Sequence, residues 1–86
     1  MYAVIVDCTD FCLEHGVYIV NNDTKAVTHI EHLPTSELAN YIFQLEDVTS
    51  VLLQGNKEYC SGIKKQLENT LALEYANKNI KIEVIK

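Results

Sequence analysis

The sequence predicts an α/β (α+β) protein in which a single five-stranded mixed sheet forms from elements in the order β-β-β-α-β-α-β. Three observations favour this class. The chain has 86 residues, enough for one domain; 48% are hydrophobic and 22% charged, as in ordinary globular proteins. Short β-branched runs alternate in the second half with segments of helical periodicity. We therefore expect residues 1–86 to form a single domain whose core needs neither metal nor disulfide.

The first half of the chain predicts three strands. Tyr2 to Asp7 form a continuous apolar run with β-branched side chains, which is typical of a central strand covered on both faces. Residues 16–20 and 26–32 form two further runs, and the turn-forming residues 21–24 between them predict a hairpin. One face of the third run is partly polar, so this strand belongs at an edge of the sheet or under thin cover.

The second half predicts two helix-strand units. Residues 35–46 carry apolar side chains at helical spacing. A short buried strand at 51–53 leads to a helix of about four turns, which is capped by either Asn56 or Ser61. Residues 80–85 alternate in polarity and close the sheet with a strand exposed on one face.

The charge of the chain is unevenly distributed. Residues 1–56 contain eight carboxylates and one lysine, Lys25, so their net charge is −7. Residues 57–86 contain six lysines and four carboxylates, so their net charge is +2 and that of the whole chain is −5. There is no arginine, the residue that reads phosphate and guanine with two hydrogen bonds, so nucleic-acid binding is disfavoured. The acidic half either attracts a protein partner with a basic surface or only keeps the domain in solution.

The cysteine count and the N-terminus predict the compartment. An odd number of cysteines, three, favours reduced thiols over a disulfide framework. No stretch approaches the roughly 20 apolar residues of a membrane span, and the first residues lack the basic leader of a signal peptide. We expect a cytoplasmic protein with no membrane contact.

The order of elements can close a sheet with strand order 3-2-1-4-5 if both crossovers are right-handed. Asp7 ends the central strand, Thr9 follows it, and Gly16 opens the next strand. This arrangement resembles the ribonuclease H-like superfamily, whose members include nucleases, resolvases and, with insertions, sugar-kinase and actin-like nucleotide-binding folds. The spacing is longer than usual there, and Cys8 replaces the proline or glycine common after the aspartate.

In the nuclease members of that superfamily, several carboxylates hold two divalent cations. The resemblance places a second carboxylate in the first helix and a third at the end of the fourth strand. Here Glu46 and Asp47 lie too near the end of the first helix, and the fourth strand ends in Gln54-Gly55-Asn56 without an acid. We therefore expect nuclease activity to be absent. Asp7 then accepts backbone hydrogen bonds in a turn.

Ligands of open α/β sheets often bind at the carboxyl ends of the parallel strands, where the backbone N–H groups of a following helix can hold an anion. The residues that the sequence places there are Asp7, Thr9, Gly55, Asn56, Ser61 and Gly62. The alternative for the segment from Gly55 is a glycine-assisted strand-to-helix turn with no ligand.

Cys8, Cys12 and His15 form a second candidate, a C-x3-C-x2-H set of residue types that zinc prefers. No second paired motif accompanies it, so two small buried thiols are the competing interpretation. Cys12 and His15 also suggest a nucleophile and its base, although no oxyanion motif or third orienting group accompanies them.

These observations predict a small cytosolic protein-interaction or regulatory module without catalytic activity and without a cofactor. The alternative is a small-ligand or nucleotide-binding domain, or a degenerate ribonuclease H-like hydrolase, with its site around Asp7 and Gly55. We also expect self-association into a homodimer or larger homo-oligomer, because two helices cannot cover both faces of five strands and the edge strands remain open.

Overall fold

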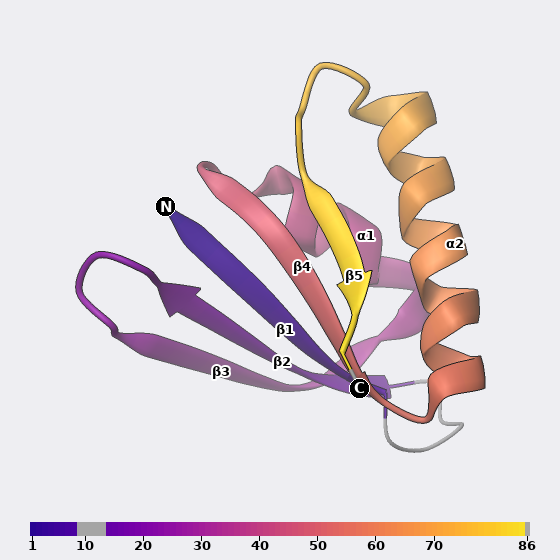
Figure 1. Ribbon diagram of the computed structural model, residues 1–86, viewed down its shortest axis with the longest axis horizontal. Coiled ribbons are helices and arrows are strands. Elements are labelled where there is room, and N and C mark those ends of the chain that lie inside the picture. Colours follow the sequence, from indigo (N-terminus) through magenta and orange to yellow (C-terminus); the bar gives the residue numbers. More distant parts are fainter. Residues whose placement is uncertain (9–13, 86) are drawn as a thin grey trace.

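The computed structural model describes residues 1–8 and 14–85, which form one five-stranded mixed sheet and two helices (Figure 1). This confirms the expected α+β class. The sheet has the strand order β3-β2-β1-β4-β5. In chain order the elements are β1 (Tyr2–Cys8), β2 (Glu14–Asn21), β3 (Val27–Pro34), α1 (Thr35–Gln44), β4 (Val48–Gly55), α2 (Lys57–Glu74) and β5 (Lys81–Val84).

Both helices lie on the same side of the sheet. Strand β1 is antiparallel to β2 and parallel to β4, β2 is antiparallel to β3, and β4 is parallel to β5. The connections through α1 and α2 therefore both step in one direction along the sheet, from β3 to β4 and then to β5. Two right-handed crossovers in one direction place their helices on one face.

A single core lies between that face and the helices. Alternate residues of β1, namely Val4, Val6 and Cys8, are fully buried in it. The helices contribute Leu38, Ile42 and Phe43 from α1 and Cys60, Ile63 and Leu67 from α2.

The opposite face of β1 differs from the sequence prediction. Ala3, Ile5 and Asp7, which alternate with the core residues, are only half-buried. The expectation that β1 is covered on both faces is wrong for the described residues, because both helices pack on one side of the sheet. An apolar strand face is left without a helix over it.

Specific contacts set the ends of the two helices. Helix α1 ends at Gln44, two residues before the expected end. The amino group of Lys78 donates to the carbonyl oxygens of Phe43, in the last turn, and of Leu45, the residue that follows the helix. Helix α2 begins at Lys57, because the side chain of Asn56 accepts a hydrogen bond from the backbone N–H of Tyr59. Neither helix is long and apolar enough to cross a membrane, among the residues that the structure describes.

Candidate functional site

The strand-to-helix turn at Gly55 lies beside the end of β1. Gly55 pairs with Cys8 in the parallel register, and the next N–H, that of Asn56, donates to the carbonyl oxygen of Cys8 at 3.1 Å. Gly55 has a φ of 125°, which favours glycine. The carboxyl ends of β1 and β4 therefore meet where α2 begins, and three predicted ligand residues, Asp7, Gly55 and Asn56, are near one another there.

Ser61 and Gly62 lie elsewhere, inside α2. The hydroxyl of Ser61 donates to the carbonyl oxygen of Lys57, one turn earlier, at 3.0 Å. Gly62 is exposed, and a Cβ atom at this position would have no neighbour within 4 Å. Both residues are therefore part of a regular helix rather than of the turn. Thr9, the remaining predicted ligand residue, lies outside the described residues.

His15 is a buried strand residue, although the sequence analysis expected this strand to begin only at residue 16. It is 2% exposed and lies on the core face of β2, level with the first turns of both helices. Its Nδ1 is 3.2 Å from the carbonyl oxygen of Asp7, and its Nε2 is 2.7 Å from the hydroxyl oxygen of Thr35 and 3.3 Å from that of Tyr59. A carbonyl oxygen only accepts, so Nδ1 donates and Nε2 accepts in the neutral ring.

The contacts of His15 use both ring nitrogens within the protein, and its ring also stacks on Tyr59 with centroids 5.7 Å apart. Cys8, the other described member of the predicted metal set, is fully buried in the core, and Cys12 lies outside the described residues. Within residues 1–8 and 14–85, no three His, Cys, Asp or Glu side chains are grouped to hold a metal ion. The geometry of His15 is that of a structural contact between β2, α1 and α2.

The sequence analysis expected two helices to leave part of the sheet uncovered, but it did not identify the apolar side chains on the sheet face opposite the helices, which we call the open face. No described helix or strand covers it. The strand register arranges its side chains in rows across the sheet. The first row consists of Val27, Val20, Ala3, Ser50 and Lys81. The second row consists of His29, Tyr18, Ile5, Leu52 and Glu83.

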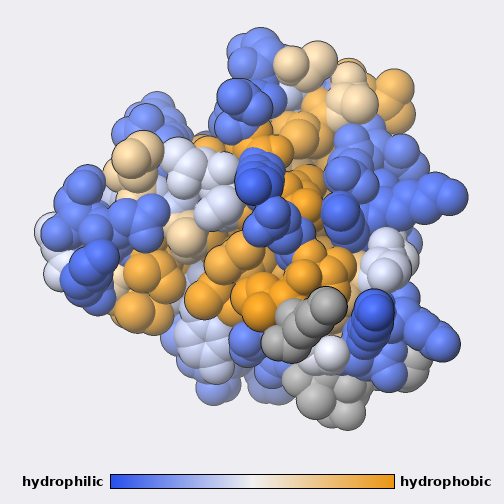
Figure 2. Space-filling view, viewed as in Figure 1, coloured by the Kyte–Doolittle hydropathy of each residue, from blue (hydrophilic) through white to orange (hydrophobic). Residues whose placement is uncertain are grey.

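The third row is polar and contains Asp7 paired with Gln54, with Gly16 beside Asp7. The first two rows together hold a continuous apolar patch, made up of Val27, Val20, Ala3, Tyr18, Ile5 and Leu52. Figure 2 shows hydrophobic surface over the middle of the sheet, bordered by hydrophilic side chains. Val27 is 58% exposed, and the other five members of the patch are half-buried.

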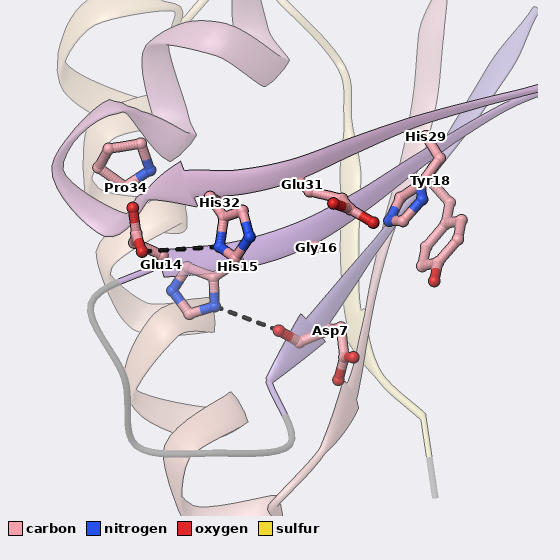
Figure 3. A pocket seen from close by; sticks show the side chains of 9 residues that line it. All are labelled: Asp7, Glu14, His15, Gly16, Tyr18, His29, Glu31, His32 and Pro34. Carbon is pink, nitrogen blue, oxygen red and sulfur yellow. Dashed lines mark hydrogen bonds and ion pairs between the residues drawn. The ribbon is translucent and has the colours of Figure 1, made fainter.

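A shallow depression of about 920 Å³ lies on the open face, where β1 and β3 end and β2 begins (Figure 3). The ring of His29 stacks on Tyr18 and passes close to Gly16, where a Cβ atom would be 3.5 Å from Nε2 of His29. On the rim of the depression, Nδ1 of the exposed His32 lies 3.6 Å from a carboxylate oxygen of Glu14. The residues that line the depression are Asp7, Glu14, His15, Gly16, Tyr18, His29, Glu31, His32 and Pro34.

Among the described residues, this lining contains the carboxylates of Asp7, Glu14 and Glu31 and the imidazole rings of several histidines. The carboxylates of these described residues offer acceptors for a cationic group. Asp7 and Glu31 make this end of the open face acidic, whereas Lys81, on the edge strand β5, forms an ion pair with Glu83 of the same strand at 3.1 Å. Comparison with protein-family models, with curated proteins and with solved structures found no match to this chain.

Proposed function

We propose that the chain is a non-catalytic protein-interaction module that binds its partner with the open face of the sheet. The apolar patch on this face is the observation that supports the proposal. Antiparallel and mixed sheets with one face in water normally place polar residues on that face. Here the central positions of three neighbouring strands are Tyr18, Ile5 and Leu52 instead.

The patch is contiguous and has a polar border, which is the pattern of a docking surface. Its aromatic member, Tyr18, presents a large apolar ring at low cost in side-chain entropy. Asp7 and Gln54 lie on one side of the patch, and Glu83 and Lys81 lie on another. A partner that covers the patch therefore gains apolar burial at the centre and polar contacts at the rim.

The alternative function is a small-ligand or nucleotide-binding domain, or a degenerate ribonuclease H-like hydrolase. The turn at Gly55 favours it, because this turn lies where the carboxyl ends of β1 and β4 meet the start of α2. A thermal-shift screen with nucleotides and divalent ions tests this function. A rise of the melting temperature by several degrees with either class of compound would favour it over the interaction module.

The interaction function is tested by capture on beads from an extract of the source cells. Leu52→Glu places a charge in the middle of the patch. Leu73→Glu is the matched control, because Leu73 is 84% exposed on α2 and lies away from the open face. We expect wild type and Leu73→Glu to retain the same protein and Leu52→Glu to lose it. Equal capture by all three chains would contradict the proposal.

A further inference from the structure

We draw no further inference here: the strongest candidate, the apolar patch around Tyr18, Ile5 and Leu52 on the open face of the sheet, is the surface already described, and nothing in the described part of the chain shows what covers it.

Discussion

Tyr18 and His29 stack face to face across β2 and β3 on the open face, with ring centroids 4.3 Å apart and ring planes 2° apart. Directly opposed aromatic pairs stabilise a sheet by about 0.2 to 1 kcal/mol. We predict a coupling of about 0.5 to 1 kcal/mol between Tyr18→Ala and His29→Ala in a double-mutant cycle, measured by urea unfolding at a concentration where the chain is monomeric. Additive effects of the two substitutions would show that the stack contributes nothing to stability.

The buried contacts of His15 predict a structural role. Leucine at this position fills the space but removes the donor to the Asp7 carbonyl and the acceptor for the hydroxyl of Thr35. We predict that His15→Leu lowers the free energy of unfolding by about 2 kcal/mol. Thr35→Val, which removes one hydroxyl and keeps the side-chain shape, is expected to cost about 1 kcal/mol. Unchanged stability together with a loss of zinc binding in His15→Leu would mean that this histidine is a metal ligand.

Substitution of the two candidate capping residues, Asn56 and Ser61, tests where α2 begins. The Asn56 side chain accepts from the N–H of Tyr59, whereas the Ser61 hydroxyl donates to a helix carbonyl one turn back. We predict that Asn56→Ala destabilises the protein by about 1 kcal/mol and that Ser61→Ala changes its stability by less than about 0.5 kcal/mol. Thermal unfolding followed by circular dichroism compares the two. The reverse order of effects would place the first helical turn at Ser61.

Local patterns in the sequence predicted the elements where one face of an element differs clearly from the other. In β5, Ile82 is buried while Lys81 and Glu83 are exposed, as their alternation indicated. In α2, Ile63 and Leu67 are buried at helical spacing. Such contrasts are visible within a few residues of the chain, so no knowledge of distant contacts is needed.

The covering of β1 was not predictable from the same kind of pattern. Val4 in the core and Ile5 on the open face have similar side chains, so an apolar run does not say which face has a helix over it. That depends on the direction of both crossovers, which is a property of the whole sheet. His15 was misplaced for a different reason, since the alternation of His15, Val17 and Ile19 on one buried face carried the signal for an earlier start of β2.

Asp7 distinguishes the interaction module from a metal-dependent function. Its side chain lies on the open face beside Gly16, and asparagine keeps one acceptor oxygen and nearly the same size. We predict that Asp7→Asn leaves the fold intact, with a change in stability below about 1 kcal/mol. Melting curves with and without magnesium or manganese ions are the measurement. Ion-dependent stabilisation that is present in wild type and lost in Asp7→Asn would make Asp7 a metal ligand.

Substitution of Gly62 tests whether this glycine is an ordinary helix residue or part of a ligand-binding site. It lies inside α2, is exposed, and has open space where a Cβ atom would be, so alanine fits without any contact having to move. Glycine costs a helix interior about 0.5 to 1 kcal/mol relative to alanine, because the unfolded chain loses more conformational freedom on folding. We therefore predict that Gly62→Ala stabilises the protein by about that amount in urea unfolding and leaves self-association unchanged in sedimentation. If the backbone at Gly62 instead had to approach a ligand closely, the methyl group of alanine would block that approach. Suppose that Gly62→Ala is more stable than wild type without a ligand but lacks a rise in melting temperature that a ligand gives wild type. Gly62 would then belong to a ligand-binding site.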